Sequence, residues 1–152
     1  MTNEEFMGEA LKEAKKASAI GEVPIGAIIV KDGEIIGRGH NETIKNNDAS
    51  AHAEMNAIRN ASKNIENYRL TGADLYVTIE PCAMCSGAII WSRLKTVYFG
   101  AYDKKAGCAG SLYDLPEDSR FNHRAVVVPG IREKECAEII SDFFAELRKK
   151  NE

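Results

Sequence analysis

The sequence predicts an α/β protein, a three-layer α/β/α sandwich around a mixed sheet of about five strands. The first reason is the order of the expected elements, which runs helix, hairpin, helix, strand, helix, strand, strand, helix. The second is the almost wholly apolar run 25–30, which is typical of a strand buried on both faces. Because 152 residues suffice for one full core, we expect a single domain over residues 1–152.

An amphipathic helix is expected at the N-terminus. Thr2 and Glu5 have the spacing of a capping box, in which each side chain bonds the backbone N–H of the other residue. The apolar residues that then recur at helical intervals are Phe6, Ala10, Leu11, Ala14 and Ala17. Gly21 should end this helix.

A β-hairpin should follow the first helix. The strand 25–30 leads into Asp32 and Gly33, a pair that favours a tight turn between antiparallel strands. The returning strand is expected at 34–40, and residues 41–50 form a polar loop.

The middle of the chain should alternate between helices and strands. The second helix is marked by apolar residues at helical spacing, namely Ala53, Ala57, Ile58 and Ala61. A strand at 75–79, a helix at 83–93 and a strand at 96–99 come next. Because a helix joins these two strands, they should run parallel.

A long glycine-rich connection, residues 100–122, separates these elements from the C-terminal part, and we allow one short helix in it. Loops of this length inside compact domains are commonly functional. Residues 125–128 should form the fifth strand, and Pro129 and Gly130 turn the chain. The terminal helix has an apolar stripe formed by Cys136, Ile139, Ile140, Phe143, Phe144 and Leu147.

The composition is typical of a globular protein, and we expect it in the cytoplasm. The first residues lack the regions of a secretory signal, and no apolar run approaches the length of a membrane span. A net charge of −3 argues mildly against a protein coated in nucleic acid, although a local basic face stays compatible with it. The four cysteines are more naturally reduced thiols or metal ligands than disulfides.

Two motifs indicate a catalytic zinc site. His52 stands at the start of the second expected helix, and Cys82 and Cys85 follow Pro81 at the start of the third. Two thiolates with this spacing can face one ion from a first helical turn, and an imidazole from another helix supplies a third ligand. The fourth position then holds water, whose pKa bound Zn²⁺ lowers to roughly 7. His-x-Glu together with Pro-Cys-x-x-Cys is the signature of zinc-dependent nucleobase deaminases.

Glu54 is the expected proton carrier. In the middle of a helix, Glu54 would face about 200° away from His52. We therefore expect His52 at the first turn, where an imidazole and a carboxylate can reach opposite sides of one water. Glu54 would accept a proton from that water and deliver it to the ring nitrogen and the leaving ammonia. The helix N-termini should also favour the thiolate forms of both cysteines.

Each motif alone has a plainer interpretation. A Cys-x-x-Cys pair also occurs in structural zinc sites and redox proteins, and a lone His-x-Glu carries no meaning. A structural zinc would need a fourth ligand, for which Cys108, Cys136, His40 and His123 are the candidates. Cys136 lies on the apolar stripe, which favours the core, and Cys108 fits as a small loop residue. The conjunction of both motifs at helix starts favours catalysis.

Two further polar residues are candidates for contacting a substrate. Asn41 directly follows the second strand, where its amide could reach a base edge; the alternative is a turn residue. Asp103 lies just beyond the fourth strand, where ligands gather in open α/β sheets. Its alternative is a solvated or capping aspartate.

Beyond these motifs, the chain resembles the bacterial tRNA-specific adenosine deaminases along nearly its whole length. The matching stretches are residues 21–27, 51–54, 68–70, 75–82, 110–112, 121–124 and 141–144. The first and last of them look specific to the tRNA enzymes rather than to deaminases of free bases. The chain departs from the family at Ala49, where proline is common.

The resemblance implies a cytidine-deaminase-like fold and a single zinc-dependent deaminase domain over residues 1–152. It also implies a homodimer that binds tRNA anticodon stem-loops, with each site completed by the partner subunit. It also implies one Zn²⁺ per subunit, because His52, Cys82 and Cys85 match the zinc ligands of the family. Glu54 matches the proton shuttle.

The resemblance further implies substrate contacts. Asn41 matches the residue that reads the flipped base, Val23 lines the pocket for that base, and Asp103 matches a contact to the sugar of a neighbouring nucleotide. The implied reaction is attack of zinc-bound hydroxide on C6 of adenine, giving inosine at the wobble position of an arginine tRNA. The alternatives are a deaminase of a free base such as guanine or cytosine, and a non-catalytic zinc module that binds RNA.

Overall fold

The computed structural model describes residues 1–151. In chain order its elements are α1 (Asn3–Ala19), β1 (Gly26–Lys31), β2 (Glu34–His40), α2 (Ala53–Ile65), β3 (Asp74–Ile79), α3 (Ala83–Trp91), β4 (Thr96–Ala101), β5 (Val126–Val128) and α4 (Glu133–Lys150). The expected strands and the four expected main helices are therefore present, with ends shifted by a few residues.

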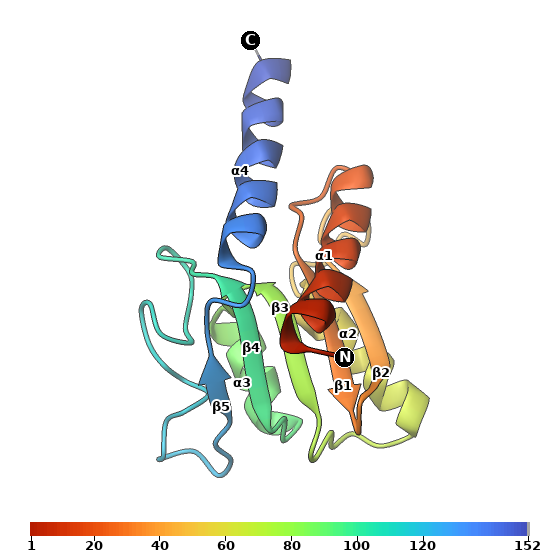
Figure 1. Ribbon diagram of the computed structural model, residues 1–152, viewed down its shortest axis with the longest axis vertical. Coiled ribbons are helices and arrows are strands. Elements are labelled where there is room, and N and C mark those ends of the chain that lie inside the picture. The colour runs from red at the N-terminus through yellow and green to blue at the C-terminus, as the bar shows by residue number, and fades with distance from the viewer. Residues whose placement is uncertain (152) are drawn as a thin grey trace.

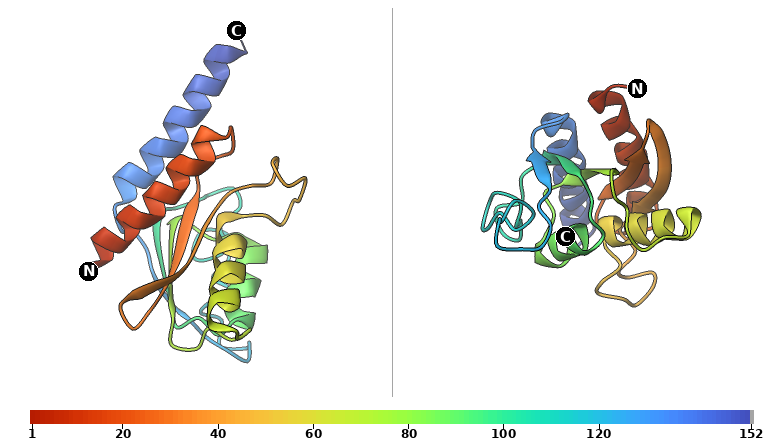
Figure 2. Two further views of the ribbon diagram at one scale, coloured as in Figure 1. Left: turned by 90° about the vertical axis from the view of Figure 1, so that its right-hand side faces the viewer. Right: turned by 90° about the horizontal axis from the view of Figure 1, so that it is seen from below.

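The predicted sandwich with a mixed five-stranded sheet is confirmed (Figure 1). The strand order is β2-β1-β3-β4-β5; β1 runs antiparallel to β2 and β3, whereas β3, β4 and β5 are parallel. The two views in Figure 2, one from the side and one from below, show α1 and α4 on one face of the sheet and α2 and α3 on the other. The expected parallel pairing across a helix is thus present in β3-α3-β4.

Both faces of β1 are buried, as its apolar run predicts. Ala27 and Ile29 belong to the core under α2, and Ile28 and Val30 belong to the core under α1. Successive side chains of a strand point to opposite faces, so one apolar run serves two cores. The predicted capping box at Thr2 is also present, since the Glu5 N–H donates to the Thr2 hydroxyl at 3.1 Å.

The expectation of a short helix in the connection 100–122 is wrong. This segment consists of turns and one isolated bridge between Ala109 and Asp114. Its backbone N–H groups donate to other partners than the carbonyls of a helix, among them the side chain of Glu80 and the carbonyl of Pro81. The segment is fixed by long-range contacts, which a local pattern does not encode.

The edge strand β2 is covered by α2. The contact is close because a Cβ at Gly37 or Gly39 would collide with the backbone of α2. Three asparagines spaced four residues apart on α2 then bond the outward backbone groups of β2: Asn56 to the His40 carbonyl at 2.9 Å, Asn60 to the Arg38 N–H at 3.0 Å and Asn64 to the Ile36 carbonyl at 2.7 Å. Covering an exposed strand edge in this way prevents pairing with another chain.

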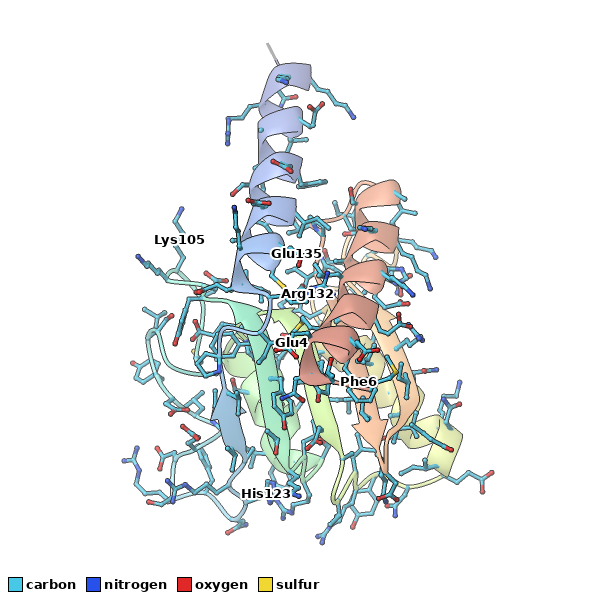
Figure 3. The ribbon with its side chains drawn as sticks, in the orientation of Figure 1. Glu4, Phe6, Lys105, His123, Arg132 and Glu135 are labelled. Carbon is cyan, nitrogen blue, oxygen red and sulfur yellow. The ribbon has the colours of Figure 1, made fainter. Side chains whose placement is uncertain are left out.

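The terminal helix α4 is anchored at its start. Arg132 lies between α1 and α4 in Figure 3, where its guanidinium bonds the carboxylate of Glu135 and the carbonyl of Glu4. Cys136 is buried, as expected. Farther along, the helix extends past the sheet, and Phe144 and Leu147 are 39% and 43% exposed. Across residues 1–151, every helix is too short or too polar to serve as a membrane span.

One edge of the sheet collects the candidate residues. The register pairs Gly26 with His40 and Ile79 with Ala101, so the start of β1 and the ends of β2, β3 and β4 lie together. The helices α2 and α3 begin at this edge. His123 lies at the opposite end, since it contacts the carbonyl of Leu94, which precedes β4 (Figure 3).

Candidate metal and substrate site

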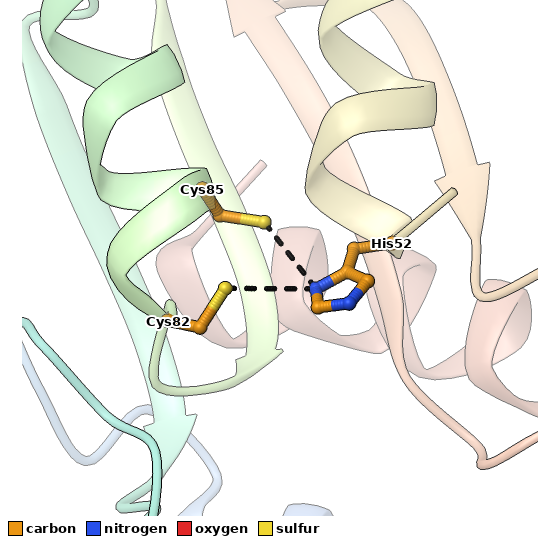
Figure 4. A group of neighbouring side chains, drawn as sticks. All are labelled: His52, Cys82 and Cys85. Atoms are coloured by element: carbon orange, nitrogen blue, oxygen red, sulfur yellow. Dashed lines mark hydrogen bonds between the residues drawn. The ribbon is translucent and has the colours of Figure 1, made fainter. Parts of the chain in front are cut away.

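The side chains of His52, Cys82 and Cys85 converge between the starts of α2 and α3 (Figure 4). The Nδ1 atom of His52 lies 3.6 Å from Sγ of Cys82 and 3.7 Å from Sγ of Cys85. The three donor atoms all lie within 4.8 Å of one another. The three ligands predicted from the sequence motifs therefore lie together in the folded protein.

The donor set fits a tetrahedral zinc ion. Zinc–sulfur bonds of about 2.3 Å and zinc–nitrogen bonds of about 2.05 Å at a tetrahedral angle place sulfur and nitrogen about 3.6 Å apart. The two measured nitrogen–sulfur separations match this value. Three protein ligands leave one coordination position open, which is typical of catalytic rather than structural zinc.

Helix geometry explains how the three ligands meet. His52 and Cys82 are the N-cap residues of α2 and α3, and both have extended backbone conformations. Their side chains therefore project from the helix ends, while Cys85 lies one turn into α3. This confirms the expectation that His52 stands at the start of its helix, with Glu54 in the first turn.

Glu54 is buried beside the cluster. Burial raises the pKa of Glu54 to about 7, and the nearby Cys82 sulfur contributes in the same direction. A carboxyl group with a pKa near neutrality can both accept and donate a proton at physiological pH. Its position and its pKa suit the proton transfer expected from the sequence.

The two cysteines differ in their acidity. A hydrogen bond from the Cys85 thiol lowers the pKa of Cys82 to about 4, with a further contribution from His52. The same interaction, together with burial, raises the pKa of Cys85. Thiolate at Cys82 and the buried acid Glu54 concentrate negative charge at this point, which a divalent cation neutralises.

None of the four alternative ligands joins the cluster within residues 1–151. Cys136 lies in the core under α1, and His40 contacts Glu13 at 3.1 Å. His123 lies at the opposite end of the sheet. Cys108 is buried in the loop after β4, with its thiol directed to the carbonyl of Ala106.

The structure brings Val23 and Asp103 together. They line one cavity of about 430 Å³ with Lys105 and, from α4, Phe144. Asp103 caps a turn, since its Oδ1 accepts from the N–H groups of Lys105 and Ala106, both at 3.1 Å. The capping alternative for Asp103 is therefore realised, and its second carboxylate oxygen has no part in those two bonds.

Asn41 is buried at the end of β2, and its backbone N–H donates to the carbonyl of Ile25 at 3.1 Å. That bond places Asn41 at the sheet edge that carries the metal ligands, beside Ile25, which follows Val23 by two positions. Asn41 does not belong to the residues that line the cavity of Val23 and Asp103.

Comparisons with known proteins agree with this geometry. Residues 1–101 match the cytidine and deoxycytidylate deaminase zinc-binding region. The tRNA-specific adenosine deaminase of Bacillus subtilis is 54% identical over 151 residues, covering 99% of this chain and 94% of that protein. The chain belongs to the zinc-dependent deaminases, and among them to the tRNA-specific adenosine deaminase family.

Two solved structures extend the comparison. One is described as a tRNA A34 deaminase that edits adenosine to inosine at the wobble position; it matches with a TM-score of 0.85 and 45% identity over 89% of this chain and 98% of that chain. The other is the guanine deaminase of Bacillus subtilis, with a TM-score of 0.66 and 43% identity over 73% of this chain and 71% of that chain. Both support the cytidine-deaminase-like fold, and the zinc site is His52, Cys82 and Cys85.

Sequence reasoning missed three residues that shape this site. Glu22 and Glu80 are buried carboxylates that accept from backbone N–H groups and from one hydroxyl each. Asn56 joins the ends of the loop 41–51. Glu22 accepts from the N–H groups of Ile44 at 3.2 Å and Lys45 at 2.8 Å. An acidic residue next to apolar neighbours was the only local signal for the two glutamates.

Proposed function

We infer that this chain is a zinc-dependent hydrolytic deaminase that converts adenosine to inosine at the wobble position of tRNA. The observation that carries this inference is the three-ligand cluster with buried Glu54 beside it, in a chain of the tRNA-specific adenosine deaminase family. We propose that residues 1–152 act as one deaminase domain. The cytoplasm is the compartment in which such an enzyme meets tRNA.

Glu54 moves the protons in the proposed mechanism. Bound zinc supplies acidity at its open coordination position, where it lowers the pKa of water to roughly 7. The Glu54 carboxylate accepts a proton from the attacking water and donates it to N1 of adenine as C6 becomes tetrahedral. A second transfer through the same carboxyl gives the departing amino group its proton, so that ammonia leaves and inosine remains. The buried position of Glu54 excludes bulk water from these transfers.

Asn41, Val23 and Asp103 are proposed to hold the substrate. Asn41 stands at the same sheet edge as the metal ligands, where its amide can bond a base edge. The cavity of Val23 and Asp103 also contains the cation of Lys105 and the ring of Phe144, which suit a phosphate and a stacked base. A cation and an aromatic ring at this one place would let the chain bind RNA locally although its net charge is −3.

The proposed substrate is the anticodon stem-loop of an arginine tRNA. An adenosine in a single-stranded loop is already free of a pairing partner, so its extrusion into a pocket costs little. Loop shape, stacking and 2′-hydroxyl contacts would then recognise the RNA with few phosphate contacts.

The test compares substrates. Purified zinc-loaded protein is incubated separately with the anticodon stem-loop, free guanine and free cytosine, and inosine, xanthine, uracil and ammonia are measured. We expect inosine from the stem-loop and no turnover of the bases. A stem-loop with its adenosine moved by one position is the control. The likeness to a guanine deaminase makes guanine the relevant competitor, and turnover of free bases alone would contradict the tRNA assignment.

A homodimer is proposed from the outer face of α3. Met84 and Trp91 are exposed on this helix, Trp91 by 75%, and Gly87 has open space around it. Trp91 and Phe121 line one cavity of about 290 Å³. A helix that is apolar on its outer as well as its inner side requires a further covering surface. A second copy of the chain fits, because the family resemblance implies a site completed by its partner subunit.

The oligomeric state tests this interface. We expect Trp91→Lys to convert a dimer to a monomer in sedimentation velocity and to lower deamination of the stem-loop. Tyr68→Lys is the matched control, since Tyr68 is equally exposed at 75% but lies outside α3. A wild-type protein that sediments as a monomer, or a dimer that tolerates Trp91→Lys, would exclude this interface.

A further inference from the structure

The carboxylate of Glu80 is the centre of the loop that follows β4. Glu80 directly follows β3, and its side chain is only 2% exposed. It accepts hydrogen bonds from the backbone N–H groups of Asp103 at 3.0 Å, Ala109 at 3.0 Å and Ser111 at 2.8 Å, and also from the Ser111 hydroxyl. Four donors from one loop therefore point at one buried side chain.

These hydrogen bonds replace the water that an exposed carboxylate would bind. Among the residues that the structure describes, the ion pairs join other carboxylates and leave Glu80 without a cationic partner. A buried carboxylate is costly unless it is fully hydrogen-bonded, and bonds from N–H groups to an ionised acceptor are among the stronger ones. The loop can keep this charge buried only while it holds its observed shape.

The loop encloses the carboxylate without spare room. A Cβ at Gly107 would collide with the carboxyl group of Glu80 and with the carbonyl of Asp103. The Gly107 N–H donates to that same carbonyl at 2.8 Å, which closes the turn headed by Asp103. The Glu80 side chain thus sets the position of the turn from which Asp103 faces its cavity.

The same loop is tied to the metal site. The N–H of Cys108 donates to the carbonyl of Pro81 at 2.8 Å, directly before the zinc ligand Cys82. Glu80 and Pro81 are consecutive, so both attachments of the loop directly precede Cys82 and the start of α3. A movement of residues 80–82 would therefore move the loop, and with it the cavity that Asp103 lines.

We propose that Glu80 is a positioning residue for substrate: its buried carboxylate holds residues 103–111 in the shape that presents Asp103 to the RNA. This inference rests on the proposed function, because it assigns Asp103 a role in binding. Glu80 itself takes no part in proton transfer. Its effect should appear in substrate binding rather than in the chemical step.

The test uses Glu80→Gln in the full-length, zinc-loaded enzyme. The amide replaces one acceptor by a donor that faces backbone N–H groups. We expect one zinc per chain, a KM for the stem-loop raised about tenfold and a kcat within about threefold of wild type. In a double-mutant cycle with Asp103→Ala, the double variant should have the KM of the weaker-binding single variant. The proposal would be overturned if the two single substitutions raised KM independently, so that their factors multiply in the double variant. It would also be overturned if KM did not change in Glu80→Gln.

Further variants keep the test decisive if Glu80→Gln folds poorly. Gly107→Ala adds one methyl group against the same carboxyl and should raise KM in the same way. Both variants should speed amide hydrogen exchange at Ala109 and Ser111. Glu117→Gln is the control, because Glu117 also accepts a backbone N–H, from Val127 at 3.0 Å, but outside this loop. A wild-type enzyme inactive on the stem-loop would refute the proposed function, whereas the exchange rates test the loop separately, and unchanged rates would refute its dependence on Glu80.

Discussion

The side-chain amide of Asn56 donates to the carbonyl of His40 at 2.9 Å and lies 3.4 Å from the carbonyl of Ala51. These carbonyls directly precede Asn41 and His52. The Asn56 side chain therefore joins both ends of the loop between β2 and α2. One end carries Asn41, which is proposed to read the base, and the other carries the zinc ligand His52.

Replacing Asn56 should misplace both of those residues. We expect Asn56→Leu to keep its fold but to lose about tenfold in kcat/KM for the stem-loop, since small displacements of positioning groups are costly. Steady-state kinetics and circular dichroism measure this. Asn60→Leu is the matched control, because it breaks a similar bond to β2 one turn farther from the site. Equal losses in both variants would mean that general destabilisation is the cause.

Removing one sulfur ligand should remove the metal. We expect Cys85→Ala to contain no zinc by elemental analysis and to show no deamination, because two ligands hold zinc far more weakly than three. Cys108→Ala should keep both metal and activity, since the Cys108 thiol bonds the Ala106 carbonyl instead. Zinc retained in Cys85→Ala and lost in Cys108→Ala would reverse the assignment.

Glu54 should be needed for the chemistry but not for the metal. We expect Glu54→Ala and the isosteric Glu54→Gln to bind zinc normally and to lose a factor of about 10²–10⁴ or more in kcat, the usual contribution of a positioned acid–base group. Single-turnover assays with the stem-loop give the rate, and elemental analysis gives the zinc content. Turnover at the wild-type rate in either variant would contradict the role.

Asp114 should make stability depend on pH. Burial and the neighbouring Glu117 raise the pKa of Asp114 to about 6. A carboxyl whose pKa is higher in the folded state favours folding fully only below its unfolded pKa of about 4, and this stability is lost as the pH rises through 6. Asp114→Asn should therefore raise the melting temperature more at pH 7.5 than at pH 4. An equal difference at both pH values would exclude the linkage.

Much of this protein follows from local sequence patterns. The recurrence of apolar residues at helical intervals predicted the helices, and the unbroken apolar run predicted that β1 is buried on both faces. The zinc ligands could also be predicted from the sequence, because metal binding requires particular residue types at short spacings near helix starts. The need for His52 and Glu54 to face one water predicted His52 at the start of α2, and it is the N-cap there.

Tertiary structure alone decided how distant segments hold the site. Glu80 meets donors 23 to 31 residues away, Asn56 meets a carbonyl 16 residues back, and Glu22 meets the loop more than 20 residues later. No periodicity records such pairings, because they depend on strand order and on which loops the sheet brings to one edge. For the same reason the expected helix after β4 is absent, since the N–H groups of Asp103, Ala109 and Ser111 donate to the buried carboxylate of Glu80. Local patterns determined which residues carry the chemistry, and the long-range packing determined where they stand.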